Sequence, residues 1–389
     1  MLGAWSLPAR ATSGPGEEPC VQTLAAQLQP GDKVIPLGKA VGIKLFSQGV
    51  LVVGFSSIQT STGTQEPGKD SGLKTGDLIT QINGQEVNTI EAVQAMVNRT
   101  QDQPLSLAVT REGKALSLTA QPVQSDTGSY QLGVWLRDSM AGIGTLTFYD
   151  PDSGVFAALG HGINDTDTAM LMPLESGSIM NASVSGVKKG TSGDPGCLQG
   201  TFDLKQDLGT LYANTQQGIF GQVDQDTFSL SGQAVEVASR QQVHSGKAVI
   251  LSNIAGDQVE EYDIEILTVY PESAGETRNL MLQVTDQRLL DATGGIVQGM
   301  SGSPILQDGR LVGAVTHVLI DDPSGLRHFG RKHGQHRQQR SGSRLIFGRN
   351  GGETPSVFFP VFYLKIPPLG GPNYVRTLSE FYLPFLAIM

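Results

Sequence analysis

One serine of this chain lies in a setting that suits covalent chemistry. Ser301 is part of residues 299–304 (GMSGSP), between a glycine-rich turn and an apolar run. Glycines let the backbone adopt conformations that are closed to other residues, and two N–H groups of such a tight turn can converge on an oxyanion. Ser301 is therefore a candidate nucleophile. The alternative is a hairpin turn with incidental serines.

A serine nucleophile needs a base, which is usually a histidine. His161 lies between two glycines at the end of an apolar strand-like run, where packing explains an imidazole poorly. His317 lies inside a strand-like run soon after Ser301, where the pattern favours a structural histidine. The remaining histidines occupy polar or basic stretches (His244, His328, His333 and His336). His161 is therefore the candidate base.

The composition narrows the class of protein. The chain has 389 residues, enough for two or three domains of ~100–200 residues each. Its 49 glycines and few aromatic residues favour a turn-rich β protein, and its net charge of −10 argues against nucleic acid as the main partner. Cys20 and Cys197 form neither a disulfide framework nor a zinc pattern. We expect no metal and no cofactor.

Residues 1–32 read as an N-terminal segment and a linker. No run in the chain reaches the ~18–20 apolar residues of a membrane span. The first residues are either the end of a signal or anchor segment that begins before Met1, or an ordinary disordered start. The first reading would allow association with a membrane.

Residues 33–125 predict a compact unit of strands with one helix. Asn83-Gly84 is a strong signal for a two-residue hairpin turn of type I′. Helical spacing over residues 90–97 follows Thr89, which is a suitable N-cap.

With the run at residues 72–79 (GLKTGDLI), this unit resembles a bacterial PDZ domain. PDZ domains bind extended segments by adding a strand at a sheet edge. The resemblance therefore implies peptide binding at Val41, Gly42 and Ile43. The alternative is a module that only spaces or restrains its neighbour.

From about residue 130 to 325 the pattern changes to many short strands separated by turns, which favours a β-barrel or sandwich. One short helix is predicted at 286–293, with Asp286 as its cap.

Four segments of this region resemble one family. They are residues 160–162 (GHG), 284–286 (VTD), 294–304 (GGIVQGMSGSP) and 313–318 (GAVTHV). Together with the upstream PDZ-like unit, they resemble the stage IV sporulation protein B peptidases of endospore-forming bacteria. The resemblance implies a chymotrypsin-like double β-barrel after the PDZ domain. It also implies Ser301 as nucleophile, His161 as general base and acid, Asp286 as the orienting carboxylate, and oxyanion donors on Gly299 and Ser301.

The residues themselves leave the third member of this set open. Asp165, Asp167 and Asp194 are rivals of Asp286, whose structural alternative is the helix cap. A metal enzyme with Asp165 and Asp167 near His161 is a further alternative, although its ligand set is incomplete.

The resemblance also implies a signalling protease. Members cross the inner forespore membrane, cleave themselves, and then cut a regulator of an intramembrane metalloprotease, which releases processing of a pro-sigma factor. The PDZ unit is implied to recognise that regulator and to restrain or position self-cleavage. The rival function is a PDZ-containing scaffold or inactive peptidase that binds the regulator without cutting it.

Residues 326–389 depart from the family pattern. The stretch after Gly325 is basic and does not give the expected continuation. Permissible codons for residues 326–334, read one base later, encode a sequence close to that continuation. We therefore expect a frameshift after Gly325 and a non-native, disordered tail. The alternative is a solvated basic tail.

Overall fold

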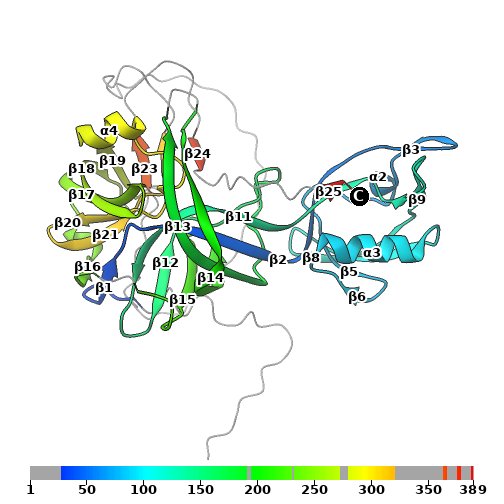
Figure 1. Ribbon diagram of the computed structural model, residues 1–389, viewed down its shortest axis with the longest axis horizontal. Helices are drawn as coiled ribbons and strands as arrows, with labels where there is room; N and C mark the ends of the chain where they lie inside the picture. Colours follow the sequence, from blue (N-terminus) through cyan, green and yellow to red (C-terminus); the bar gives the residue numbers. More distant parts are fainter. Residues whose placement is uncertain are drawn as a thin grey trace, which may run out of the picture.

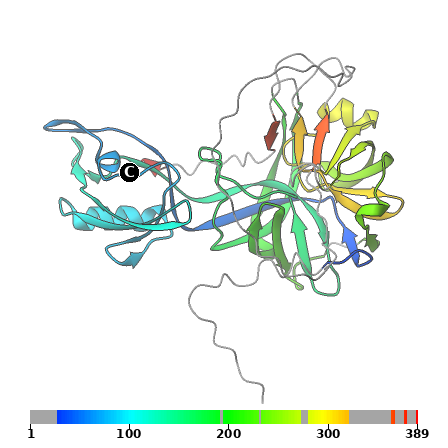
Figure 2. The same ribbon diagram turned by 180° about the vertical axis from the view of Figure 1, so that it is seen from behind.

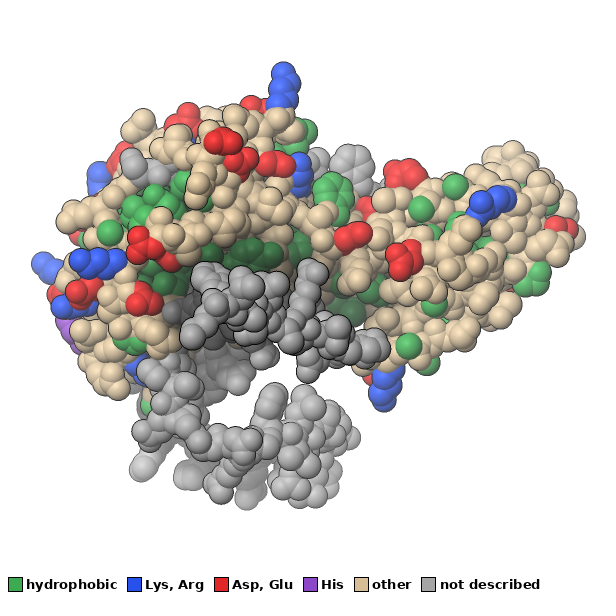
Figure 3. All heavy atoms as spheres, turned by 90° about the horizontal axis from the view of Figure 1, so that it is seen from below, with side chains coloured by type: hydrophobic (Ala, Val, Ile, Leu, Met, Phe, Trp, Pro, Cys, Tyr) green, Lys and Arg blue, Asp and Glu red, His purple; other side chains and the backbone are tan. Residues whose placement is uncertain are grey.

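The computed structural model describes residues 28–190, 194–229, 232–271 and 279–319, with three short strands of the C-terminal tail. The chain is mainly β and forms two lobes joined by a pair of long strands, as both ribbon views show (Figures 1 and 2). On the face in Figure 3, acidic and basic side chains are interspersed over both lobes. No helix in the described ranges is long and apolar enough to cross a bilayer.

The joining pair is β2 (Ala40–Phe55) and β11 (Val134–Tyr149), which we call the stalk. The two strands pair antiparallel along most of their length, from one lobe into the other. Their register breaks between Arg137 and Ser139, opposite a bend of β2 at Gly49 (φ 90°). The smaller lobe is therefore inserted into a hairpin of the larger one.

Six strands close the first barrel of the larger lobe. Each pairs with the next in the cycle β2–β11–β12–β15–β14–β13 and back to β2. The barrel strands besides the stalk are β12 (Val155–Ala158), β13 (Ser176–Lys188), β14 (Cys197–Thr215) and β15 (Gly218–Val223). A further strand, β1 (Lys33–Pro36), pairs with β11 but is not part of this cycle. Closure leaves this barrel no free edge.

A second sheet wraps around its own core and contacts the first barrel. Its order starts at β1 and runs β16–β21–β20–β17–β18–β19. The elements are β16 (Val235–Val237), η1 (Arg240–Gln242), β17 (Gly246–Ala255), β18 (Gln258–Val269), β19 (Leu280–Val284), α4 (Gln287–Thr293), β20 (Pro304–Gln307), β21 (Arg310–Ala314) and β22 (His317–Leu319). Aliphatic side chains such as Ile264, Leu282 and Ile305 form its core.

The smaller lobe is the unit predicted to be a PDZ domain. Asn83 and Gly84 both have positive φ (52° and 74°), and Thr89 Oγ1 accepts a hydrogen bond from Ala92 N at 3.1 Å, as predicted. The elements are β3 (Ile58–Thr60), β4 (Gly63–Gln65), α2 (Pro67–Asp70), β5 (Leu78–Ile82), β6 (Gln85–Glu86), α3 (Ile90–Thr100), β7 (Leu105–Arg111), β8 (Lys114–Ala120), β9 (Val123–Gln124) and β10 (Tyr130–Gln131).

The structure corrects the predicted start of this unit at residue 33. β1 and the first part of β2 pair with barrel strands. Val41, Gly42 and Ile43 are paired with β11 on one side and β13 on the other, and the side chains of Val41 and Ile43 are fully buried. Strand addition needs an unpaired edge, so the predicted peptide site at these residues is wrong. The sequence pattern does not reveal this boundary, because one uninterrupted strand, β2, runs from the barrel into the smaller lobe.

Most of the tail predicted to be frameshifted lies outside the described residues. Its three described strands pair with the rest of the chain: β23 (Phe362–Lys365) with β19, β24 (Val375–Thr377) with β22, and β25 (Ala387–Ile388) with β11. The frameshift and the role of residues 1–27 remain predictions.

Gly49 provides a test of the stalk. A Cβ at this position would lie 2.9 Å from the Ile79 carbonyl oxygen, on a backbone with φ 90°. We expect Gly49→Ala to lower the free energy of unfolding by about 2–4 kcal/mol, from steric overlap added to backbone strain. Urea unfolding measures this. Gly113→Ala is the control, because Gly113 also has positive φ but faces open space; an equal loss in both variants would contradict the steric argument.

Candidate active site

The turn that carries Ser301 depends on two glycines. Gly299 and Gly302 have φ of 95° and 97°, a region that side chains disfavour. A Cβ on Gly302 would lie 2.6 Å from the backbone nitrogen of Leu159, so only glycine fits against that strand. The turn is closed by Gly302 N–H, which donates to Val315 O at 2.7 Å.

His161 follows β12 through an unusual backbone segment. Leu159 has φ of 68° although it carries a side chain, and Gly160 has the same value. A left-handed conformation costs a non-glycine residue roughly 1–2 kcal/mol, and such strain is found mostly where function requires it. A Cβ on Gly160 would lie 2.6 Å from Thr316 Cγ2. The histidine segment therefore packs directly against the strand region that follows Ser301.

Thr145 of β11 joins the serine turn to the histidine segment. Its N–H donates to Ser301 O at 3.1 Å, and its hydroxyl donates to Gly299 O at 2.7 Å. Its own carbonyl accepts from Leu159 N at 3.2 Å. Sequence reasoning missed Thr145, because nothing in the sequence distinguishes it from other strand threonines.

The two predicted reacting groups are both buried and unpaired. Ser301 is 2% exposed and His161 is 3% exposed. Among the described residues, neither Ser301 Oγ nor His161 Nε2 has a hydrogen-bond partner. A buried polar atom without a partner is costly and calls for an explanation. Transfer of a proton between Ser301 Oγ and His161 Nε2 during a reaction would explain why both atoms are kept without partners. A substrate can reach these two atoms only after some of the residues that bury them have moved aside.

The tautomer of His161 is set by a backbone carbonyl. Nδ1 lies 2.9 Å from Gly162 O, which can only accept, so Nδ1 carries the proton. Nε2 is then unprotonated, as a general base must be. Burial lowers the pKa of His161 and outweighs the opposing hydrogen bond to Gly162. The imidazole therefore stays neutral at physiological pH.

His317, expected to be structural, lies beside His161. The centroids of the two rings are 6.1 Å apart, and His317 Nδ1 is 2.8 Å from Thr316 Oγ1. Burial, with a smaller contribution from the charge of His161, lowers the pKa of His317 to about 4. A neutral His317 does not repel the positive charge that His161 acquires during the reaction.

The N–H groups predicted to bind an oxyanion are available. In residues 296–303, the hydrogen bonds of the described residues use the N–H groups of Gln298, Met300, Gly302 and Ser303. None of them uses Gly299 N–H or Ser301 N–H. This is the pattern expected of a turn that reserves two donors for a ligand.

Asp286 does not lie among the described contacts of His161. It caps α4 by accepting from Arg288 N at 2.8 Å, and it pairs with the Arg288 guanidinium at 2.8 Å. The hydrogen bonds from Arg288 hold the pKa of Asp286 below its usual value. The orienting role implied for Asp286 is not supported, because the described contacts of His161 include no carboxylate. The predicted cap role is confirmed.

The rival carboxylates are also engaged elsewhere. Arg137 binds Asp165 and Asp167, while Asp194 pairs with Lys188 at 2.5 Å. Within the described ranges, no group of three or more His, Cys, Asp and Glu residues is placed to hold a metal ion.

A closed six-stranded barrel that carries a histidine, set against a second half that carries a glycine-flanked serine, defines a serine peptidase with a domain inserted in its first barrel. The comparisons agree. Residues 128–328 match the SpoIVB peptidase S55 family, and residues 48–121 match the PDZ domain family. The first match covers just over half of the chain, so the chain belongs to the SpoIVB peptidase S55 family, a family of serine peptidases. The predicted PDZ and peptidase domains are confirmed.

Two individual proteins are also similar to the chain. A protein of Vibrio cholerae serotype O1 named as a zinc metalloprotease is 30% identical over 183 residues, which cover 44% of this chain and 35% of that protein. The chain therefore spans about a third of that relative's length. The crystal structure of the PDZ domain of the SdrC-like protein from Listeria monocytogenes is 20% identical, with a TM-score of 0.19, over 23% of this chain and 87% of that one.

The position of Asp286 gives a prediction that separates a cap from a catalytic carboxylate. We expect Asp286→Ala to lower the free energy of unfolding by about 1–2 kcal/mol through loss of the cap, while peptidase activity per folded molecule changes only a few-fold. Urea unfolding and activity per titrated active site measure the two effects. Asp286→Asn is the control: an activity loss near ~10⁴-fold at unchanged stability would restore the orienting role.

The two buried histidines predict a loss of stability in acid. Both have a lowered pKa in the folded protein, so the unfolded chain binds protons first as pH falls below the ordinary value of 6.5. Stability should be full above that value and fall by up to about 1.4 kcal/mol per pH unit for each histidine below it. For His317 the fall continues to about pH 4. Urea unfolding between pH 7 and 5 measures the slope, which His317→Asn should reduce; an unchanged slope would contradict the assignment.

Proposed function

We propose that this chain is a serine endopeptidase that uses Ser301 and His161 as a dyad oriented by the Gly162 carbonyl. Ser301 Oγ transfers its proton to His161 Nε2 as it attacks the scissile carbonyl carbon. The N–H groups of Gly299 and Ser301 receive the oxyanion of the tetrahedral intermediate. The imidazolium then protonates the leaving amine, and water hydrolyses the acyl-enzyme by the reverse sequence.

One observation carries this proposal. Ser301 Oγ and His161 Nε2 are buried, without partners in the described part of the chain, on two segments that Thr145 and the glycine contacts hold together. An apolar residue at either position would cost less if the segment had only a structural role. The unused N–H groups of Gly299 and Ser301 agree with the same chemistry.

We extend the proposal to the pathway that membership of the family suggests. The chain crosses the inner forespore membrane, cleaves itself, and cuts a protein regulator of an intramembrane metalloprotease, which activates processing of a pro-sigma factor. The PDZ domain, inserted within the first barrel, recognises that regulator. An anchor before Met1 would hold the protein at the membrane. A PDZ domain joined to a peptidase implies protein substrates or partners, and this supports the proposal at that level.

The second candidate function is a PDZ-containing scaffold that binds the regulator without cutting it. The burial of Ser301 favours this reading if the cover never opens. The two candidates differ in one measurable property, the reactivity of Ser301.

Labelling of the purified chain by a fluorophosphonate probe tests the proposal. We expect wild type to be labelled and Ser301→Ala to lose labelling by more than ~10³-fold, because the nucleophile is removed. Ser303→Ala is the matched control. Ser303 is buried and donates to Ser252 Oγ at 3.1 Å, so its loss affects stability but not the nucleophile. A folded wild type without labelling would favour the scaffold.

A further inference from the structure

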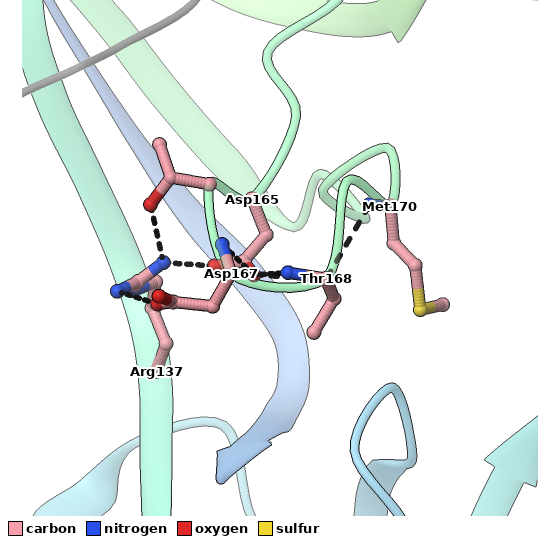
Figure 4. Close-up of polar contacts among 6 residues, drawn as sticks. Arg137, Asp165, Asp167, Thr168 and Met170 are labelled. Atoms are coloured by element: carbon pink, nitrogen blue, oxygen red, sulfur yellow. Dashed lines mark hydrogen bonds and ion pairs between the residues drawn. The ribbon is translucent and has the colours of Figure 1, made fainter.

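The loop after His161 is bound to the stalk. This loop covers residues 164–171 and is closed at its base by a bridge between Asn164 and Leu171. Arg137 of β11 donates to Asp165 and, at 2.7 Å, to Asp167. Figure 4 shows the guanidinium facing these carboxylates, with Met170 at the far end of the loop.

The ion pairs are part of the internal structure of the loop. The Asp165 side chain is fully buried, and that of Arg137 is 11% exposed. Asp165 Oδ1 accepts from the N–H groups of Asp167 at 3.1 Å and Thr168 at 2.7 Å. A buried carboxylate that loses its cation is strongly destabilised. The shape of the loop therefore depends on Arg137.

The same loop leads directly back to His161. Met172 N donates to Ile163 O at 2.9 Å, where the chain returns from the loop. Asn214 of β14 binds both Ile163 and Met172 through its side chain, at 2.8–2.9 Å. His161 lies two residues before Ile163, so only a short segment separates the imidazole from the bonded base of the loop.

The residue that follows Arg137 contacts the PDZ domain. This residue is Asp138 of β11. Its carboxylate accepts from Ile90 N at 2.8 Å, at the start of α3. The break in stalk register falls at this place. One dipeptide of the stalk thus contacts both the PDZ helix and the loop after His161.

We propose that Arg137 is a positioning residue for the peptidase reaction: by holding Asp165 and Asp167 it fixes the loop after His161 and thereby the placement of His161 against Ser301. This inference rests on the proposed function, because it requires Ser301 to react through His161.

The test is the reaction of the full chain with a fluorophosphonate, analysed as a maximal rate (kinact) and a half-saturating concentration (KI) per labelled site. Arg137→Met should lower kinact by about tenfold or more and leave KI within about twofold, since the base is displaced while the probe site remains. Arg137→Lys keeps the charge and should restore kinact to within a few-fold of wild type. Asp167→Asn removes one of the two ion pairs of Arg137, at a half-exposed position, and should lower kinact by about two- to fivefold.

Arg111→Met is the matched control. Arg111 binds the fully buried Asp77 at 2.6 and 2.7 Å, in the same two-bond manner, but within the PDZ domain. Its kinact should equal that of wild type. Counting per labelled site removes any loss of folded protein, so a purely structural role of Arg137 would leave kinact unchanged.

The outcomes separate the two proposals. Equal kinact in wild type and Arg137→Met, or an equal fall in Arg111→Met, overturns the inference alone. If Arg137→Met does not fold, an unchanged kinact in Asp167→Asn overturns it. Absence of labelling in folded wild type overturns the proposed function, and this inference with it.

Discussion

The contact between the serine turn and the histidine segment passes through Thr145. Its N–H, carbonyl and hydroxyl groups all bind segments that carry the reacting residues: two bonds reach the Ser301 turn, and one reaches Leu159. The contact works only because Gly302 has no side chain to separate the two segments. The placement of the serine turn against the histidine segment therefore depends on hydrogen bonds in a buried region, where water does not compete for the donors and acceptors.

A second property of the site is that a backbone carbonyl replaces the expected carboxylate. Gly162 O fixes the proton of His161 on Nδ1 but supplies less negative charge than an aspartate. The imidazolium formed during the reaction would then gain less stabilisation, which agrees with the lowered pKa of His161. The nearby His317, also kept neutral by burial, adds no opposing charge.

The hairpin that carries the inserted PDZ domain also carries residues that contact the active-site segments. β2 and β11 run from the first barrel into the PDZ domain without a flexible linker. Thr145 and Arg137 lie on the same strand, so one strand contacts the serine turn at one point and the loop after His161 at another. Movement of the PDZ domain would act on β11 directly.

Several local features of this protein can be predicted from its sequence. The glycines around Ser301 and His161, the Asn83-Gly84 turn and the Thr89 and Asp286 caps follow from conformational preferences of single residues, which act over a few positions. These features, with the family resemblance, gave the mainly β class, the PDZ and peptidase domains, and Ser301 and His161 as candidates. Which distant segments meet is seen only in the folded chain. The fold placed Val41, Gly42 and Ile43 in a barrel strand, Asp286 at the start of α4, Thr145 against the serine turn, and Arg137 against the loop after His161. Strand pairing and burial connect residues far apart in the chain, and no local pattern of residues records those partners.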